Sequence, residues 1–337
     1  MKNIFRRCRA PLFLILSAML PLEVSVQLAR GQGSGERGAA PVYEKAKAAA
    51  VEVLVNGHLS GSGWFADPKG FLLTAAHVIE GPGQKVEVNS PAIGRVAAEV
   101  AAVDLGHDLA LLRVAAREAA YPALALAEKS PPPGTEVFLF GAPIYRHGVL
   151  LPGMVARDDS TFEYYEDSYV EVTHIAATVP IGMSGGPWLN SRGEVVGLNS
   201  AVMSQNALPV GVSFSVPLPA IRALLKNRKT SATPSLGAAV EELWQQDAKI
   251  IDRYPPQTEG LMVAILHNDG PAARGGLKQG DLIVAAEGTK VRLTEDLLSI
   301  IAKKSPGQSL ELRLLNPDGA GERKATVTLG KLEVNWP

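Results

Sequence analysis

From residue 50 to residue 216 the chain is built of short β-branched and apolar runs, each followed by glycine, proline or other turn-forming residues. Such runs occupy residues 50–55, 70–74, 86–88, 109–114, 136–140, 169–173, 193–198 and 212–216. Short strands at this spacing favour antiparallel barrels or a sandwich. The pattern therefore predicts a mainly β domain and leaves the choice between these two architectures open.

Two helices are expected at the ends of this β-rich region. Residues 42–50 form a candidate short helix. Residues 217–226 form a second, because Pro219 lies near its start, apolar residues share one face and basic residues lie at its end. The polar stretch 227–234 ends in proline and is the best candidate for a linker.

A second folded unit is expected from residue 235 to residue 337. Its apolar runs predict strands near 261–266, 282–286, 310–315 and 325–329. A short helix is expected to start near Pro271, and a longer one is expected over residues 294–303. The chain is thus expected to contain two domains, which its length of 337 residues allows.

The N-terminal 31 residues have the pattern of an export signal. A basic start precedes an apolar stretch of 12 residues, 11–22, which is too short to span a bilayer comfortably. An uncleaved anchor is the alternative. The single cysteine, Cys8, precedes the apolar stretch, so a mature chain has no disulfide to form. Residues 32–41 are rich in glycine and small residues and are expected to be flexible.

The charge balance and the motif content exclude several classes of function. The chain has 33 basic and 34 acidic residues, so its formal net charge of −1 gives no reason to expect nucleic acid as a partner. The phosphate-binding string Gly-x-x-x-x-Gly-Lys-Ser/Thr does not occur in the sequence. The histidines show no metal-ligand spacing, so neither a metal nor another cofactor is expected.

Three local strings carry candidate catalytic groups. His77 follows the run Leu-Thr-Ala-Ala, Asp108 directly precedes the apolar run 109–112, and Ser184 lies in Gly-Met-Ser-Gly-Gly-Pro. A serine hydroxyl attacks a carbonyl only when a base takes its proton, and histidine oriented by aspartate is such a base. Glycines beside the serine let the backbone turn sharply and present successive N–H groups.

The order histidine, aspartate, serine, the short first interval and the string around Ser184 resemble the HtrA/Deg branch of chymotrypsin-like proteases. The resemblance covers about residues 42–226 and implies a chymotrypsin-like double β-barrel. It implies His77 as the general base, Asp108 as its orienting group and Ser184 as the nucleophile. The N–H groups of Gly182 and Ser184 would form the oxyanion hole. The family usually has asparagine or aspartate where Met183 stands, and we expect Met183 to pack beneath the loop, because the donors are backbone groups.

The same resemblance suggests where the substrate binds. It puts Thr178, six residues before Ser184, at the base of the pocket for the P1 side chain, with Ile181 and Val202 lining it. The edge strand that pairs with the substrate backbone would be formed by Ser200, Ala201 and Val202. The uncharged pocket predicts small or medium apolar P1 residues.

Residues 270–283 closely resemble the helix–turn–strand signature of bacterial PDZ domains, which bind a peptide as an added strand and hold its C-terminal carboxylate in backbone N–H groups. The resemblance puts the carboxylate loop at Leu236, Gly237 and Ala238. The helix near 294–302 would flank the peptide groove. Leu297, Leu298 and Ile301 could line this groove or the core, and the sequence does not separate the two roles.

The resemblance implies an ATP-independent serine endopeptidase that cleaves misfolded or exposed polypeptides outside the cytoplasm, with a PDZ domain for C-terminal peptides. HtrA proteins usually form trimers, so a homotrimer is expected. A catalytically inactive protease-like scaffold, whose PDZ domain recruits partner proteins, is the alternative. The expected boundaries are 42–226 for the protease domain, 227–234 for the linker and 235–337 for the PDZ domain.

Overall fold

The computed structural model describes residues 39–337 except 82, 158, 166–167, 206–207, 317–320 and 333–337. The expected export signal and residues 32–38 of the expected flexible segment lie outside these residues. No helix in the described part of the chain is long and apolar enough to cross a membrane.

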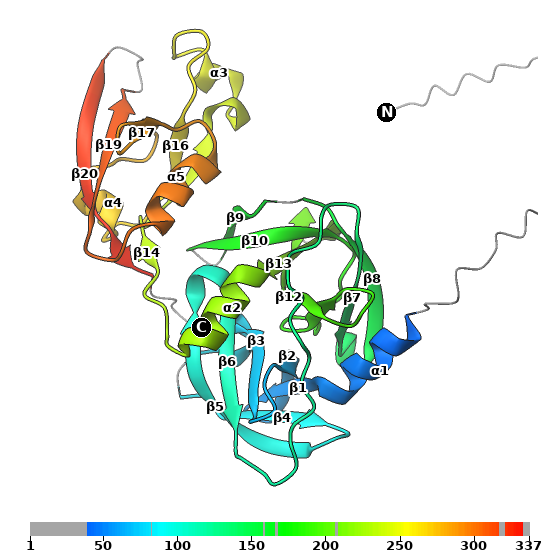
Figure 1. Ribbon diagram of the computed structural model, residues 1–337. Helices are drawn as coiled ribbons and strands as arrows, with labels where there is room; N and C mark the ends of the chain where they lie inside the picture. The colour runs from blue at the N-terminus through cyan, green and yellow to red at the C-terminus, as the bar shows by residue number, and fades with distance from the viewer. Residues whose placement is uncertain are drawn as a thin grey trace, which may run out of the picture. The chain divides into compact units, whose positions relative to one another are not determined.

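The first half of the β-rich region is a closed six-stranded antiparallel barrel. Its strand order is β1-β2-β3-β6-β5-β4 (Figure 1, blue to cyan). The strands are β1 (Ala50–Val55), β2 (His58–Phe65), β3 (Phe71–Ala75), β4 (Val86–Ser90), β5 (Gly94–Asp104) and β6 (Leu109–Val114). Their alternating side chains fill a core around the fully buried Trp64, Leu72 and Leu111.

The second half forms a second barrel. Its sheet order is β13-β12-β11-β7-β8-β10-β9, and β10 also pairs with β13, which closes the ring. The strands are β7 (Glu136–Gly141), β8 (Val149–Val155), β9 (Thr161–Tyr165), β10 (Ser168–Ala176), β11 (Pro187–Leu189), β12 (Val195–Gln205) and β13 (Leu208–Pro217). The double-barrel prediction is confirmed.

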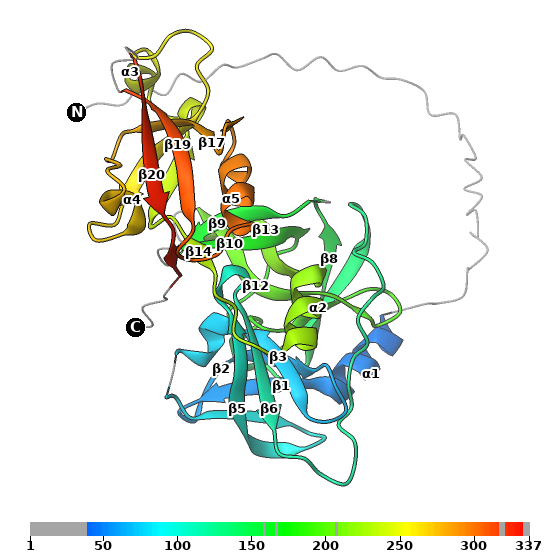
Figure 2. The same cartoon turned by 60° about the vertical axis from the view of Figure 1, so that its left-hand side comes forward.

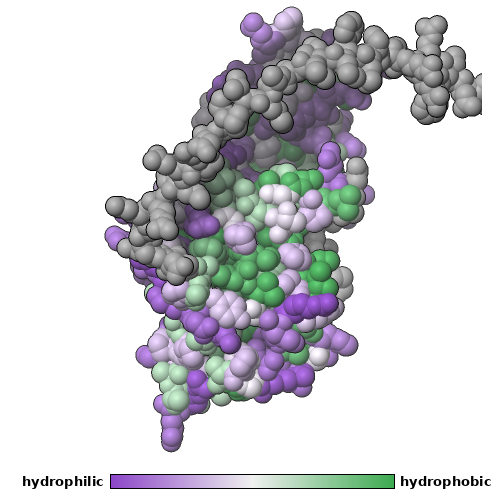
Figure 3. Space-filling model, turned by 90° about the vertical axis from the view of Figure 1, so that its right-hand side faces the viewer, coloured by the Kyte–Doolittle hydropathy of each residue, from purple (hydrophilic) through white to green (hydrophobic). Residues whose placement is uncertain are grey.

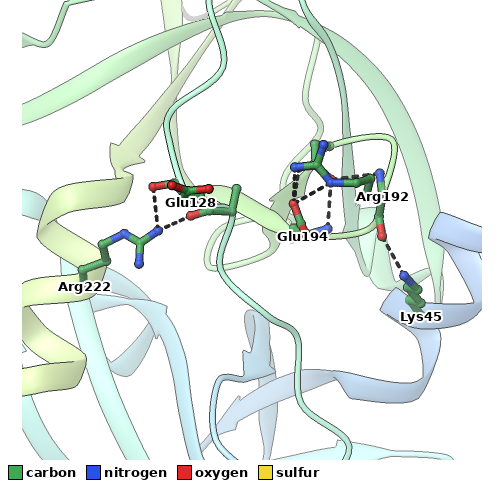
Figure 4. A network of polar contacts seen from close by, with 7 residues as sticks. Lys45, Glu128, Arg192, Glu194 and Arg222 are labelled. Carbon is green, nitrogen blue, oxygen red and sulfur yellow. Dashed lines mark hydrogen bonds and ion pairs between the residues drawn. The ribbon is translucent and has the colours of Figure 1, made fainter.

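Helices α1 (Ala40–Ala49) and α2 (Leu218–Asn227) confirm both expected flanking helices. Figure 2 shows α2 beside strands of both barrels, where it buries Ile221 and Leu224. Polar contacts attach α1 to the loop between β11 and β12, and α2 to the segment that connects the two barrels (Figure 4). Lys45 on α1 donates to the Arg192 carbonyl at 2.7 Å, and Arg222 on α2 donates to the Glu128 carbonyl at 3.1 Å.

The C-terminal unit is a partly open antiparallel sheet with helices, as the PDZ resemblance predicts. Its main order is β15-β16-β17-β19-β20, so β15 is an edge strand. The strands are β14 (Pro234–Ser235), β15 (Ala238–Glu242), β16 (Leu261–Leu266), β17 (Leu282–Ala286), β18 (Thr289–Lys290), β19 (Ser309–Leu315), β20 (Glu322–Thr328) and β21 (Gly330–Lys331). The helices are α3 (Ala248–Ile251), α4 (Pro271–Arg274) and α5 (Thr294–Ala302). Leu297, Leu298 and Ile301 of α5 are all buried in its core.

Among the strands longer than two residues, six have no counterpart among the sequence-based predictions: β2, β5, β8, β9, β11 and β15. β2 and β5 are rich in glycine and alanine, which are depleted in strands. In β2 the glycines are needed for close packing: a Cβ on Gly61 would lie 2.8 Å from the Ser184 carbonyl oxygen, and one on Gly63 would lie 2.8 Å from the Leu73 carbonyl oxygen. The small residues that hide β2 from sequence patterns therefore let it pass beside the candidate nucleophile.

Candidate active site

His77 and Asp108 come from two neighbouring strands of the first barrel. His77 lies in the 3₁₀ turn η1 (Ala76–Ile79) that follows β3, and Asp108 separates the 3₁₀ turn η2 (Leu105–His107) from β6. Asp108 accepts two hydrogen bonds from His77, one from the backbone N–H at 2.9 Å and one from Nδ1 at 2.8 Å. The pair of bonds fixes the orientation of the imidazole and directs Nε2 away from the aspartate.

Asp108 is held as a buried carboxylate. Its side chain is 5% exposed, against 30% for His77. Burial opposes its ionisation, but the charge of His77 and hydrogen bonds from His77 and Ser200 outweigh this and lower the pKa of Asp108 below its usual value. A carboxylate that stays charged in this position can stabilise a protonated histidine.

Ser200 contributes directly to this group. Its hydroxyl donates to Asp108 Oδ2 at 2.5 Å, and the residue is fully buried at the start of the irregular part of β12. The sequence-based prediction assigned Ser200 only to the strand that pairs with substrate. The structure adds a side-chain contact with the aspartate, for which the sequence carried no local signal.

Ser184 lies on the loop that precedes β11 of the second barrel. Its Oγ donates to the Ser200 carbonyl at 3.1 Å, and its own carbonyl accepts from the Ser62 N–H at 2.8 Å. The structure therefore brings Ser184 beside Ser200, whose hydroxyl contacts Asp108. The structure thus joins His77 directly to Asp108 and connects Ser184 to this pair through Ser200.

The backbone on the N-terminal side of Ser184 is fixed by several bonds. The Ile181 carbonyl accepts from the Ile144 N–H at 2.8 Å, so the trans peptide directs the Gly182 N–H to the opposite side. Gly182 has a φ of +97°, and a Cβ there would lie 2.4 Å from the Ala142 carbonyl oxygen. The buried Ser62 hydroxyl bridges the Gly182 carbonyl at 2.8 Å and the Ala142 N–H at 3.1 Å. Ser62 is a second residue that no motif indicated.

Met183 is completely buried and belongs to the core of the second barrel with Trp188. The expectation that it packs beneath the loop is confirmed. Its carbonyl accepts from the Gly186 N–H at 3.0 Å, which closes a tight turn around Ser184.

A cavity of about 530 Å³ opens beside Ser184. It is lined by Leu59, Ser60, Ala142, Ile144, Tyr145, Val179, Pro180, Ile181, Gly182, Ser184, Asn199, Ser200, Ala201, Val202 and Pro209. Ile181, Ser200, Ala201 and Val202 therefore lie where the sequence predicted. Thr178 does not: it is exposed and outside this lining, whereas the adjacent Val179 is buried and lines the cavity. The prediction is therefore wrong by one position, because the part of this segment that lines the cavity begins at Val179.

Large apolar side chains surround the mouth of the cavity. Ile144, Tyr145 and Ile181 are 58%, 68% and 90% exposed. Ile144 also has left-handed backbone angles, φ 45° and ψ 47°, which are unusual for a β-branched residue. Figure 3 shows that apolar side chains gather on one face of the molecule, between hydrophilic surfaces. Apolar surface around a cavity favours the binding of apolar chain segments.

The predicted carboxylate loop of the C-terminal unit lies at the start of β15, a strand whose outer edge is contacted by Tyr169. Gly237 has a φ of +68°, and Leu236 and Ala238 are buried at the start of β15. Arg37–Pro337 form one compact unit, within which the Tyr169 hydroxyl of β10 contacts this strand. It accepts from the Val240 N–H at 2.8 Å and donates to the Val240 carbonyl at 3.1 Å. These two groups lie on the unpaired edge of β15, since β16 covers the other edge.

Known families match both parts of the chain. Residues 61–198 match the trypsin-like peptidase domain, and residues 234–329 match the PDZ domain. A probable periplasmic serine endoprotease, DegP-like, from Halomonas elongata is 31% identical over 283 residues, covering 82% of this chain and 56% of that protein. A putative serine protease HhoA from Synechocystis is 27% identical over 289 residues, covering 82% of this chain and 71% of that protein.

Solved structures agree on the fold. A structure of the HtrA-type protease AlgW with a tripeptide superposes with a TM-score of 0.64 at 23% identity, covering 88% of this chain and 98% of that one. A serine endoprotease from Yersinia pestis gives a TM-score of 0.61 at 22% identity. This chain spans only about half the length of the DegP-like relatives it matches, 56% for the Halomonas protein. The chain therefore carries a trypsin-like peptidase domain followed by a PDZ domain, and it is similar to serine proteases of the HtrA/Deg family.

Proposed function

We propose that this protein is an active serine endopeptidase that cleaves misfolded or exposed polypeptides without ATP. The observation that carries the proposal is the double hydrogen bond from His77 to the buried, charged Asp108 beside the Ser184 loop. The periplasmic names of the DegP-like relatives support an exported protein that works outside the cytoplasm.

In this proposal Ser184 Oγ attacks the scissile carbonyl while His77 Nε2 takes its proton. His77 then gives the proton to the leaving amine, and Asp108 stabilises the imidazolium in between. The tetrahedral oxyanion is bound by the N–H groups of Gly182 and Ser184. Preorganised backbone donors contribute about 3 kcal/mol each to such a transition state, so the bonds that fix the Gly182 peptide serve catalysis directly.

An incoming substrate strand is expected to pair with residues 200–202. A backbone N–H of the substrate would donate to the Ser200 carbonyl, which in the free protein accepts a hydrogen bond from Ser184 Oγ. The Ser184 hydroxyl would then donate to His77 instead. Substrate binding and activation of the nucleophile are thereby linked through a single acceptor.

The P1 side chain is expected to enter the cavity beside Ser184. Its lining contains no charged residue, and Val179, Val202 and Pro209 supply apolar surface. An acidic or basic side chain would lose hydration there without gaining a partner. We therefore propose cleavage after Val, Ala, Leu or similar residues.

The PDZ module is proposed to bind free, apolar C-termini of peptides through Leu236, Gly237 and Ala238. Gly237 has the left-handed angles that let successive N–H groups turn toward a carboxylate. Affinity at the micromolar level or weaker fits one added strand and one side-chain pocket. Calorimetry with the full-length Ser184→Ala variant tests this: a peptide should bind and its C-terminally amidated form should not.

The assembled protein is proposed to be a homotrimer, and light scattering measures its mass in solution directly.

A serine-directed phosphonate probe separates the active enzyme from an inactive scaffold. The probe should label Ser184 in the wild-type protein and nothing in the Ser184→Ala variant, and labelling should parallel casein cleavage. A folded wild-type protein that neither reacts nor cleaves, with and without added C-terminal peptide, would support the scaffold.

A further inference from the structure

A second cluster of ionisable side chains lies directly beside the Asp108 turn. His107 Nδ1 is 2.9 Å from Asp104 Oδ2, and His107 Nε2 is 3.4 Å from Glu171 Oε2. Asp104 ends β5, His107 ends the turn η2, and Glu171 belongs to β10 of the second barrel. One imidazole therefore connects both barrels at the residue before Asp108.

The turn that His107 ends presents Asp108 in an unusual conformation. Asp108 has left-handed angles, φ 50° and ψ 48°, and its N–H bonds to the Leu105 carbonyl at 3.3 Å. A left-handed aspartate persists only where its surroundings fix it. The Asp108 carbonyl is held by the Ala76 N–H at 3.0 Å, on the side of η1. The side chain of His107 supplies the corresponding connection toward β5 and β10.

Charge explains why a histidine suits this position. Asp104 is 7% exposed and Glu171 is half-buried, so two carboxylates share a poorly hydrated region around His107. Burial opposes protonation of His107, but Asp104 and Glu171 outweigh it and raise the pKa of His107 to about 9. At neutral pH the ring donates one N–H to each carboxylate.

We propose that His107, as an imidazolium bonded to Asp104 and Glu171, is a positioning residue that holds the turn presenting Asp108 to His77. It touches neither substrate nor reacting atoms and acts through Asp108. The proposal rests on the catalytic roles proposed above for His77, Asp108 and Ser184.

Other groups around His107 are accounted for. The Ser160 hydroxyl donates to Glu171 at 2.5 Å, and Lys304, which borders the same region, pairs with Glu287 at 3.2 Å. Tyr169 also borders it, and burial raises the pKa of Tyr169 to about 12. Between pH 7 and 10, His107 is therefore the member of this cluster expected to change charge.

The test uses the full-length protein and a short apolar chromogenic peptide. His107→Gln should lower kcat about tenfold with KM within about twofold, because Asp108 and not the substrate site is disturbed. The wild-type kcat should fall as pH rises through about 9, and the variant should lack this decline. His107→Lys keeps a cation that can reach the carboxylates and should recover most of the kcat. His174→Gln is the control. His174 on β10 also pairs with a glutamate, Glu163 on β9, at 3.3 Å, and its replacement should leave kcat unchanged.

Unchanged kcat and an unchanged pH profile in His107→Gln would overturn the proposal. If the wild-type protein proved inactive, the proposed function would fail separately. The role of His107 in holding the Asp108 turn would then be tested by hydrogen exchange at the Asp108 N–H, which should be faster in His107→Gln than in wild type. Equal exchange in the two proteins would refute it.

Discussion

The candidate active site and the unpaired edge of β15, called the PDZ edge below, differ in whether their binding groups are already occupied. At the active site the functional groups are anchored by neighbours, as when Ser200 and His77 bond to Asp108, while a cavity stays available beside Ser184. At the PDZ edge the hydrogen-bonding groups of Val240, which a peptide strand would need, already bond to Tyr169. Under the proposed function, chemistry is preorganised at the first site, whereas peptide recognition at the second would require the displacement of the Tyr169 side chain.

This difference follows from the number of acceptors each site offers. In the proposed complex an incoming strand takes the Ser200 carbonyl as one of its acceptors, and the Ser184 hydroxyl that leaves this carbonyl finds another acceptor in His77. On β15 a peptide must replace both bonds of Tyr169, whose ring also packs against the PDZ core. A hydrogen bond exchanged for an equivalent one gains little, so the affinity of the PDZ module is set by the side-chain pocket and by the cost of releasing Tyr169.

The largest expected effect tests the preorganised site. Ser184→Ala should lower casein cleavage roughly a millionfold, because the nucleophile is lost while the surrounding turn has room for alanine. His77→Ala should be nearly as severe, and the double variant should be little worse, since the triad acts as a unit. Circular dichroism should show an unchanged fold. Substantial cleavage by pure Ser184→Ala protein would show that the nucleophile lies elsewhere.

A smaller effect is expected from the contact that supports Asp108. Ser200→Ala removes a hydroxyl bonded to a buried carboxylate at 2.5 Å and should lower kcat about tenfold or more. Its main chain still pairs with substrate, so KM should change less than kcat. Ser213→Ala is a matched control, because its buried hydroxyl lies 2.6 Å from Asn199 Oδ1 and 3.2 Å from the Ala201 carbonyl oxygen and does not contact Asp108. Equal losses in the two variants would mean that packing and not the carboxylate contact matters.

At the PDZ edge, removal of a contact is expected to increase the affinity for a C-terminal peptide. Tyr169→Phe removes the two bonds to Val240 and keeps the ring, so a C-terminal peptide should bind the full-length protein about fivefold more tightly. Tyr164→Phe is the control on the neighbouring strand, since its hydroxyl faces His267 and not Val240. Titration calorimetry in the Ser184→Ala background measures both. A weaker or unchanged affinity in Tyr169→Phe would show that the peptide binds without displacing this residue.

The two regions also differ in how far the sequence predicted them. His77, Asp108 and Ser184 each lie within a short continuous string, so the motif and the chemistry coincide. Ser62 acts on Gly182 across 120 residues, and Tyr169 acts on Val240 across 71. No local pattern marks such pairs, because strand pairing and barrel closure bring them together. The error at Thr178 is one of position: the motif located the segment, but the part of it that lines the cavity begins one residue later, at Val179.

The smallest expected effect concerns stability, and it isolates the connection between the barrels. The pKa of His107 is raised in the folded protein to about 9, against about 6.5 in the unfolded chain. Its contribution to stability is therefore complete below pH about 6.5 and is lost as pH rises through about 9. His107→Gln should lower the melting temperature by about 3 °C at pH 6 and by less at pH 10. Calorimetric scans of wild type and variant at both values measure the difference. A difference in melting temperature that does not depend on pH would mean that the ring contributes packing alone, and that the charge between Asp104 and Glu171 plays no part in holding the Asp108 turn.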